Sequence, residues 1–442
     1  MRIAFGIIIK VFTMLINGVV SIFNSIINAI NGYRINKNNQ ISRGITEYQP
    51  SQIEGFFRSD EPAENAVISG GTNRIRSQTI NAIIYAACTN NLPVVVLHEA
   101  NNELETMLQM SLANTNRLIL INQSNQIYDP FVGLSDNEIS KLIMDAAPKD
   151  FDIKPNAKSY IDGMLTYIHA INKVPSLNVF AKCPHSDLFT RVDGLIANNK
   201  ITDVKGQEIK SRLMSGQSEC YKLESYFSSL DDQIDSILSR KSTQSQQSIT
   251  KVIDDNKVIV IDITSNVNKL LINVLITQIK NAIGKGKYVS FVADELSTEN
   301  SELFSNLIRM HSDKCKMTIS SRDLFAMCSG DEKTFNTIIG NSQRIAIYAH
   351  SSGASATKWA EAVGYYDKTE KSTSYSSSSS RSTPYNIFSF DNYSKTSGST
   401  DTVNYNMKRE YIIKPEEINR MLPNEVYVID SFKKEIAHTK LV

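Results

Sequence analysis

Cysteine and tryptophan are scarce in this 442-residue chain, which has 5 Cys and 1 Trp. The cysteines form no Cys-x-x-Cys pair, which argues against a disulfide-stapled secreted scaffold and against the common zinc modules. Cys183-Pro184-His185 offers two metal-binding side chains, but no second ligand pair stands near it in the sequence. A body with reduced cysteines in the cytoplasm is the simplest interpretation. The cysteines are Cys88, Cys183, Cys220, Cys315 and Cys328.

An excess of charge of either sign is also missing, since the formal net charge is +1. The chain therefore has no global basic field of the kind that attracts nucleic acid. Contact with DNA would require local patches or a pore assembled from several subunits. Apolar residues, by contrast, make up 41% of the chain. At this length they suffice for one large α/β domain and a smaller one.

The amino terminus is far more apolar than the rest. Residues 3–30 carry a few polar side chains three or four positions apart, which on a helix form one narrow polar stripe. Roughly 20 apolar residues suffice to span a bilayer, and small or amide side chains in one stripe suit helix packing in lipid. The sequence predicts a membrane anchor helix over residues 1–32, embedded in the lipid bilayer through residues 3–30. An amphipathic helix lying in the membrane plane is the alternative.

Basic residues follow the apolar stretch directly, at Arg34, Lys37 and Arg43. Positive charge next to a span tends to stay on the cytoplasmic side. We therefore expect a single amino-terminal anchor in the inner (cytoplasmic) membrane, with the main body in the cytoplasm.

The remaining sequence divides into a linker and an α/β domain that is interrupted by helices. Residues 33–60 are polar and unpatterned, as in a linker. Residues 61–134 and 249–442 alternate apolar runs of strand length with helical patterns, which predicts a parallel sheet with crossover helices. Residues 135–248 have helical spacing and no convincing strand, which predicts an inserted all-α domain. Residues 371–384 are Ser-rich and low in complexity, and we expect a loop or hairpin tip there.

Individual elements can be placed from the apolar runs. Strands are expected at residues 66–68, 92–97, 117–121, 257–263, 288–293, 317–321 and 344–348, and helices at residues 79–87 and 267–282 and from Pro415 onward.

A phosphate-binding loop with several parts exchanged follows the first expected strand. It reads Gly70-Gly71-Thr72-Asn73-Arg74-Ile75-Arg76-Ser77-Gln78. In the standard pattern G-x-x-x-x-G-K-[ST], backbone N–H groups wrap the phosphates and the lysine reaches the β- and γ-phosphates. Gly70 and Ser77 fit this pattern, with the Ser77 hydroxyl available for Mg²⁺. Ile75 replaces the second glycine although β-branched residues disfavour positive φ, and Arg76 replaces lysine with a larger, planar cation. We expect a degenerate nucleotide site.

The second motif is the expected strand 288–293, which ends in Asp294-Glu295. In phosphate-loop ATPases such an Asp holds Mg²⁺, and an adjacent Glu can act as the general base. By itself the motif is equally typical of a strand followed by an acidic helix N-terminus. A glycine loop on the first strand of the same sheet favours the catalytic interpretation: Glu295 as the base, and Asp294 with Ser77 as metal ligands.

These features come in the order of a known family. With its anchor, nucleotide loop, all-α insertion and late Asp-Glu strand, the chain resembles the type IV coupling proteins of conjugation and type IV secretion, within the FtsK–HerA class of ring ATPases. The family loop usually reads G-x-T-G-x-G-K-[ST], so Gly70, Thr72 and Ser77 match it. Tyr128-Asp129-Pro130-Phe131 resembles the family's Tyr-Asn-Pro-Leu, and residues 352–379 and 409–430 resemble its carboxyl-terminal passages.

The resemblance implies a P-loop NTPase (RecA-like) core that uses ATP and Mg²⁺. It also implies a homo-hexameric ring with DNA or a relaxase–DNA complex in its pore, and contacts with the membrane proteins of the secretion channel. Ser320 and Ser321 stand where the family commonly has a polar sensor, a Gln. An arginine finger from a neighbouring subunit is expected in such rings, and Arg309, Arg322 and Arg344 are candidates.

Two functions stay open. The chain is either a ring ATPase that recruits a protein–DNA substrate and drives DNA transfer, or a non-hydrolysing scaffold or receptor with the same fold. Ile75, Arg76 and the missing sensor Gln favour the scaffold, whereas the intact Asp294-Glu295 favours the motor. A soluble, unrelated P-loop enzyme is a third possibility, disfavoured by the anchor and by the carboxyl-terminal passages.

Overall fold

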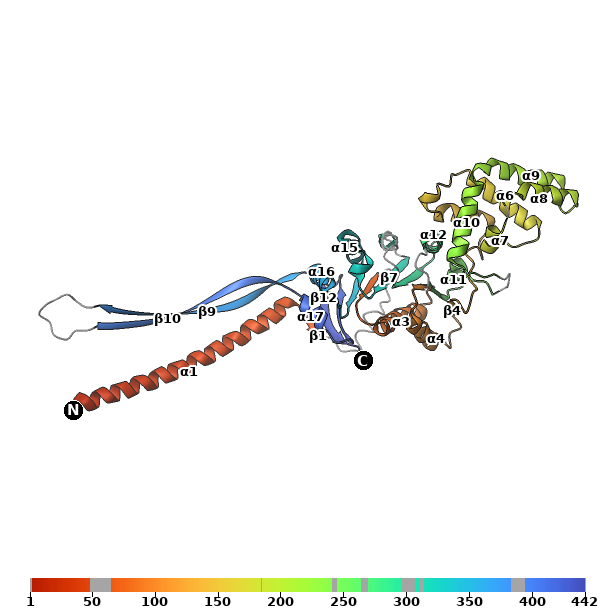
Figure 1. The fold of residues 1–442 in the computed structure, drawn as a ribbon. Helices are drawn as coiled ribbons and strands as arrows, with labels where there is room; N and C mark the ends of the chain where they lie inside the picture. Colours follow the sequence, from red (N-terminus) through yellow and green to blue (C-terminus); the bar gives the residue numbers. More distant parts are fainter. Residues whose placement is uncertain are drawn as a thin grey trace. The chain divides into compact units, whose positions relative to one another are not determined.

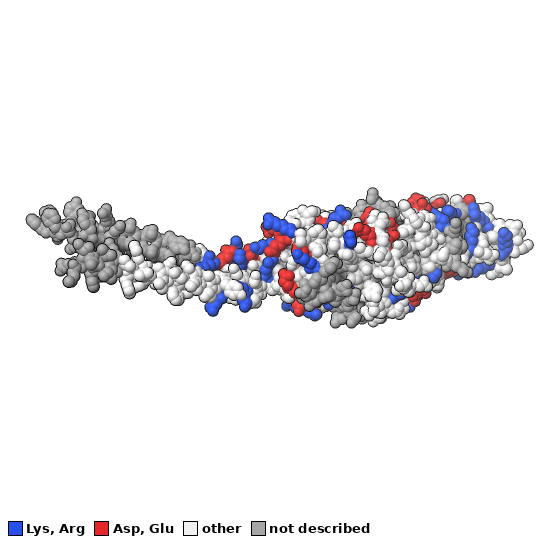
Figure 2. Space-filling model, turned by 90° about the horizontal axis from the view of Figure 1, so that it is seen from below, with Lys and Arg blue, Asp and Glu red and all other residues white. Residues whose placement is uncertain are grey.

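The computed structural model describes residues 2–47, 65–183, 185–240, 245–263, 269–295, 305, 307–309, 314–382 and 394–441, with side chains from residue 11 onward and outside 373–403. The chain divides into two compact units. The small unit comprises residues 1–46 and 359–414, and the body comprises residues 47–358 and 415–442. On the face shown in Figure 2, acidic and basic side chains are interspersed over the body, as the small net charge predicts.

The small unit consists of one long helix and one long hairpin (Figure 1). Helix α1 runs from Arg2 to Arg43, and strands β9 (Tyr365–Ser382) and β10 (Ser394–Tyr411) pair antiparallel along their whole length. Asn39 joins the helix to β9, since its amide donates to the Thr369 carbonyl (3.0 Å) and accepts from the Thr369 N–H (2.9 Å). The Arg43 guanidinium donates to the Ile412 carbonyl. Short strand β1 (Ile45–Glu47) follows α1.

The small unit departs from the sequence prediction at two places. The linker expected at 33–60 is helical as far as Arg43, because a formed helix extends cooperatively and its last turns are held by Asn39 and Arg43. Residues 48–64 of that linker lie outside the described residues. The Ser-rich stretch 371–384 is an arm of the hairpin through Ser382 and not its tip, because every backbone position there is paired with β10.

The helix α1 contains the membrane-span candidate. Among the described residues, Val11–Arg43 is the one stretch long and apolar enough to cross a bilayer, and its window is not buried. Phe12, Leu15 and Phe23 are all exposed. Between Val11 and Tyr33 the helix has no charged side chain.

The body is built on one sheet whose strands run in the order β12-β11-β8-β2-β7-β6-β3-β5-β4. The strands from β8 to β4 in this order are parallel, and β11 and β12 add an antiparallel edge. The predicted α/β class is therefore confirmed. The strands are β2 (Ala66–Ser69), β3 (Val94–His98), β4 (Leu118–Ile121), β5 (Val258–Asp262), β6 (Val289–Asp294), β7 (Cys315–Ser321), β8 (Arg344–Ile347), β11 (Glu425–Asp430) and β12 (Glu435–Lys440).

Each strand expected from an apolar run is present within two residues of its predicted bounds. Strand β3 begins only at Val94, because Pro93 has no N–H for the ladder. Helix α3 begins at Asn73, six residues before the expected Thr79. The helices beside the sheet are α3 (Asn73–Thr89), α4 (Asn102–Leu112), α11 (Ile249–Asp254), α12 (Lys269–Gly284), α14 (Leu324–Met327), α15 (Glu332–Gly340), α16 (Gly353–Val363) and α17 (Pro415–Arg420).

Helices cover both faces of the sheet, with α3 and α4 on one face and α12 and α15 on the other (Figure 1). Alternate residues of several strands, such as Val94 and Val96 of β3 or Val258 and Val260 of β5, join α3 and α4 in one buried cluster. This period of two is what a pleated strand requires. Because both faces are covered, most residues of the parallel strands are apolar, and the polar ones, such as Ser290 and Thr318, are buried too.

Between β4 and β5 the chain forms a group of helices beyond α11 and α12 (Figure 1). Among the described residues from 135 to 240 no strand occurs. The helices are α5 (Asp136–Ala146), α6 (Ala157–Ala170), α7 (Leu177–Ala181), α8 (Leu188–Ala197), α9 (Asp203–Ser215) and α10 (Cys220–Gln233), with 3-10 turns at Lys149–Phe151 and Gln217–Glu219.

The Tyr128-Asp129 motif marks the place where the chain enters this helical group. Tyr128 is fully buried, and its hydroxyl donates to Gln278 of α12 at 3.3 Å. The Asp129 carboxylate accepts from the backbone N–H groups of Phe131 (2.9 Å) and Leu177 (3.2 Å). It thereby ties the start of α7 to the entry segment. Burial raises the pKa of Asp129 to about 7, against the lowering effect of those two hydrogen bonds.

The raised pKa of Asp129 predicts a pH-dependent stability. Below the unfolded-state pKa of 3.8 the carboxyl is protonated in both the folded and the unfolded state, and the stabilisation that comes from the raised pKa is fully present. Between pH 3.8 and about 7 only the folded state holds the proton, so this stabilisation falls as pH rises and is lost above the folded-state pKa of about 7. Thermal unfolding of wild type and Asp129→Asn between pH 4.5 and 8 should show the wild type losing stability relative to the variant. A constant difference would contradict the raised pKa.

The anchor prediction concerns the whole chain. Because the apolar side chains of α1 are exposed, the full chain should stay in the membrane fraction after alkaline carbonate washing. A chain lacking residues 1–32 should be soluble. Release of the full chain by carbonate would favour the in-plane helix instead.

Candidate nucleotide site

Two glycines turn the chain sharply between β2 and α3. Gly70 and Gly71 have φ of +89° and +73°, in the left-handed region that favours glycine. A Cβ on Gly70 would come within 2.7 Å of the Tyr348 carbonyl oxygen and the His350 ring. The Gly70 N–H donates to the Ser321 carbonyl (3.0 Å) and the Gly71 N–H to the Ala349 carbonyl (2.9 Å). Both amides are therefore committed to the ends of neighbouring strands.

The loop is shorter than the motif predicts, because helix α3 starts at Asn73. Thr72 is the N-cap, and its hydroxyl accepts from the Ile75 N–H at 3.4 Å. Asn73, Arg74 and Ile75 thus form the first helical turn. Ile75 has helical backbone, so the positive φ expected to be unfavourable at this position is not required. The second half of a phosphate-wrapping loop is absent from this arrangement.

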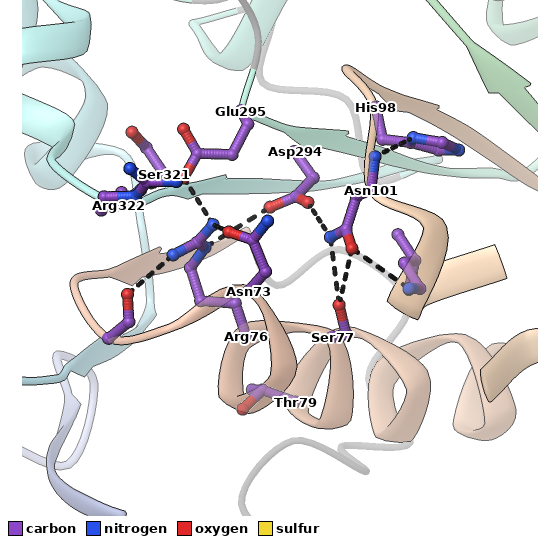
Figure 3. A network of polar contacts seen from close by, with 12 residues as sticks. Asn73, Arg76, Ser77, Thr79, His98, Asn101, Asp294, Glu295, Ser321 and Arg322 are labelled. Carbon is purple, nitrogen blue, oxygen red and sulfur yellow. Dashed lines mark hydrogen bonds and ion pairs between the residues drawn. The ribbon is translucent and has the colours of Figure 1, made fainter. Parts of the chain in front are cut away.

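Arg76 occupies the centre of the site (Figure 3). Its side chain is fully buried, and its guanidinium lies 2.5 Å from a Glu295 oxygen and 3.7 Å from Asp294 Oδ1. The same group donates to the Gly71 carbonyl (2.9 Å) and to Asn73 Oδ1 (2.7 Å). The guanidinium is thus held from both sides, by the glycine turn and by the acidic pair.

The two acidic residues differ in exposure. Asp294, at the end of β6, is fully buried, whereas the Glu295 side chain is 25% exposed. Glu295 has φ of +52°, and its N–H donates to the Ser320 carbonyl at 3.0 Å. Its carboxylate also accepts from the Arg322 N–H at 2.6 Å. The predicted pair is therefore at the expected edge of the sheet, with Arg76 as its counter-charge.

Asn101, which the motifs did not identify, links the two expected metal ligands (Figure 3). Its amide donates to Asp294 Oδ2 (2.7 Å) and to Ser77 Oγ (3.0 Å). Its side-chain oxygen accepts from the Leu104 N–H (3.2 Å) as the N-cap of α4. The one available signal was an Asn directly before the acidic helix start Asn102-Glu103.

His98 and Asp262 hold the backbone of the turn that carries Asn101. The Asn101 N–H donates to His98 Nδ1 (3.2 Å), and the Ala100 N–H donates to Asp262 (2.9 Å). Glu105 lies 3.4 Å from His98 Nε2. The hydrogen bond with His98 lowers the pKa of Glu105. These contacts fix the turn that presents Asn101 to Asp294.

The remaining predicted site residues lie in different places. Ser320 and Ser321 reach the site through their carbonyl groups, and the Ser321 hydroxyl accepts from the Asp323 N–H at 3.2 Å. Arg74 is exposed, and Gln78 is half-buried in α3.

The three arginine-finger candidates are not equivalent. Arg322 is exposed and adjoins the site of its own chain. Arg344 lies at the start of β8, the opposite edge of the sheet, and pairs with Asp430 at 2.9 Å. This pair makes Arg344 a poor finger. Arg309 is exposed, in a segment where only residues 305 and 307–309 are described.

A cavity of about 520 Å³ opens at the amino ends of α3 and α4. Thr72, Asn73, Arg74 and residues 100–103 line it. Its lining does not include Arg76, Ser77, Asp294 or Glu295. The open space beside the loop is therefore separated from the groups that would do the chemistry.

The residues as arranged do not fit Mg²⁺ and a triphosphate. The Ser77 hydroxyl and one Asp294 oxygen are bonded to Asn101, and the other Asp294 oxygen faces Arg76. The two glycine amides are bonded to carbonyl groups. In this charge-assisted network the Arg76 guanidinium is the cation beside the acidic pair, where the motif normally has a metal ion. This arrangement leaves no position for a metal-bound phosphate beside Glu295.

Comparison with solved structures identifies the fold. The chain is similar to the bacterial conjugative coupling protein TrwBdeltaN70 in its unbound form, with a TM-score of 0.51 and 11% identity over 89% of this chain and 92% of that one. It is equally similar to the plasmid coupling protein TrwB in complex with the non-hydrolysable ATP analogue ADPNP, with a TM-score of 0.51 and 11% identity over 90% and 93%. No protein-family model and no curated protein sequence matches the chain. The predicted resemblance is thus confirmed for the fold, a P-loop NTPase core of the coupling-protein type.

The buried charge network predicts a large effect of neutralising Arg76 alone. Arg76→Met leaves Asp294 buried without its counter-charge and should lower the free energy of unfolding by about 3–5 kcal/mol. The double variant Arg76→Met with Asp294→Asn removes both charges and should recover most of that loss. Urea unfolding of the full chain in detergent measures both. Arg74→Met, on the exposed side of the same turn, is the matched control. Equal stability of Arg76→Met and Arg74→Met would show that the network does not hold the site.

Proposed function

We propose that this protein, built on the coupling-protein fold, is a membrane-anchored receptor of a conjugative or type IV secretion system that works without hydrolysing ATP. Residues 3–30 anchor it in the cytoplasmic membrane, and the body recruits a protein–DNA substrate to the channel. In this proposal the helices of residues 135–248 recognise the substrate or its adaptor. A ring of six copies, alone or beside a competent ATPase, is the assembly expected from the fold.

The observation that carries the proposal is the position of Arg76. Its buried guanidinium pairs with both Asp294 and Glu295 and also closes the glycine turn. For the site to work as an ATPase, this charge would have to leave and the first turn of α3 would have to unwind. Breaking a buried ion pair costs about 3–5 kcal/mol. Nucleotide binding would have to supply that free energy before any remained for affinity.

The motor retains one specific observation in its favour. Asp294 ends β6 and Glu295 follows it, and β7 separates β6 from β2 in the sheet. The motif predicts a metal ligand and a general base at these two positions. In a motor, Glu295 would take a proton from water. Asp294 and Ser77 would hold Mg²⁺, and Arg76 would contact phosphate. The Arg76 network supports the receptor over this alternative.

The discriminating experiment is a nucleotide titration with a turnover assay on the full chain in detergent, with and without DNA. The receptor predicts no binding of a fluorescent ATP analogue with Mg²⁺ up to about 1 mM, the upper end of usual KM values. Wild type and Glu295→Gln should then have the same negligible turnover. A wild-type rate that falls about 10²–10⁴-fold in Glu295→Gln, as loss of a general base predicts, would establish the motor.

The loop-restoring variant Ile75→Gly with Arg76→Lys is the comparison for nucleotide binding by the wild type. It gives the loop the family's glycine and lysine and removes the planar cation between the acidic residues. We expect it to bind nucleotide more tightly than the wild type. Arg74→Lys, which keeps the same charge on an exposed position, should leave affinity unchanged.

A further inference from the structure

A second cavity lies far from the Arg76 site, at the opposite edge of the sheet. It has a volume of about 460 Å³ and is enclosed by α5, α11, the end of α12 and the turn before β6. Strand β6 begins beside this cavity at Val289 and ends at Asp294. The cavity therefore adjoins both the core helix α12 and the first helix of the helical group.

Its lining combines an apolar floor with a basic rim. Leu142, Ile253 and Ala282 are buried and form part of the floor. Four lysines and two acidic residues complete the rim, so the lining carries an excess of positive charge. The charged residues are Lys141, Lys280, Lys285, Lys287, Glu138 and Asp254.

Two of the lysines are already neutralised within the chain. Lys285 bonds to Glu138, and Lys287 lies 3.0 Å from Asp254. The hydrogen bond from Lys285, with bonds from Ser135, lowers the pKa of Glu138 to about 2. These two pairs leave Lys141 and Lys280, which are both exposed. In the part of the chain that the structure describes, neither has an ion-pair partner.

We infer that this cavity binds an acidic segment of a partner protein, one that carries an apolar side chain next to its carboxylates. The volume lies within the usual range for ligand sites, roughly 300–1,000 Å³. Lys141 and Lys280 pair with the carboxylates, and the floor of Leu142, Ile253 and Ala282 takes the apolar side chain. This site is independent of the Arg76 network and of the proposed lack of hydrolysis.

The lining favours a protein over a nucleic acid. It contains no aromatic side chain on which a base could stack. Its charges are lysine ammonium groups, which act as compact point charges, and it has no arginine fork for bidentate phosphate contacts. A peptide that places carboxylates beside an apolar side chain matches both the lysine ammonium groups and the apolar floor.

The position of the cavity gives the inferred contact a consequence. Helix α5 begins the helical group, and Lys141 is on α5 whereas Lys280 is on α12. An acidic segment bound between them would tie the helical group to the core. The contact would lie near the amino end of β6, whereas the Arg76 network lies at its carboxyl end.

The test uses fluorescein-labelled synthetic peptides and the full chain in detergent, followed by anisotropy. An acidic peptide of alternating glutamate pairs and leucines should bind, and added salt should weaken its binding by screening. Replacing its leucines by serines should also weaken binding, because the apolar floor is then unfilled. Lys141→Glu with Lys280→Glu should weaken binding by about tenfold or more, since two favourable charge pairs become repulsive.

The matched control is Lys149→Glu with Lys200→Glu, which changes the net charge equally at exposed positions outside the cavity. It should leave binding unchanged. The milder pair Lys141→Gln with Lys280→Gln should weaken binding in the same direction, with folding checked by circular dichroism. Failure of the acidic peptide to bind would overturn the inference, as would equal weakening by both Lys→Glu pairs. Tighter binding of a single-stranded oligonucleotide that Lys141→Glu with Lys280→Glu abolishes would assign the cavity to nucleic acid instead.

Discussion

A buried guanidinium between two carboxylates is the interaction on which the candidate site depends. Asp294 has no exposed surface at the end of a central strand, where an unpaired carboxylate would be strongly unfavourable. In a nucleotide-binding loop a metal ion and a lysine would balance that charge. Here Arg76 does so, and its remaining donors hold the Gly71 carbonyl and Asn73. The same side chain therefore satisfies the acidic pair and fixes the turn before α3.

The surrounding geometry follows from this arrangement. With Arg76 bonded to Asn73, the first turn of α3 closes at Asn73 and the loop is reduced to the glycine turn and Thr72. Asn101 then bonds both Ser77 and the second Asp294 oxygen. Arg76 and Asn101 occupy the polar atoms of Ser77, Asp294 and Glu295, and these contacts hold the ends of the strands together.

Much of the fold could be predicted from the sequence, and the partner of Arg76 could not. Parallel strands buried on both faces are mostly apolar runs, so β2 to β8 were predictable within two residues. The glycine loop and Asp294-Glu295 were predicted to belong to one sheet, and they meet at the same edge of it. Motif spacing, however, compares Arg76 with a lysine that contacts phosphate, and it contains no information on a contact with residues more than two hundred positions away. Asn101 was missed for the same reason. The Ser-rich strand β9 was missed because low complexity does not reveal the pairing with β10.

Amide hydrogen exchange at residues 70–77 of the full chain, with and without ATP and Mg²⁺, tests the central claim most directly. The N–H groups of Gly70, Gly71 and Arg76 are already bonded to carbonyl groups. The account predicts slow exchange at these amides that nucleotide does not alter, and faster exchange in Arg76→Met. Fast exchange in the wild type that becomes slow only when ATP and Mg²⁺ are added would contradict it.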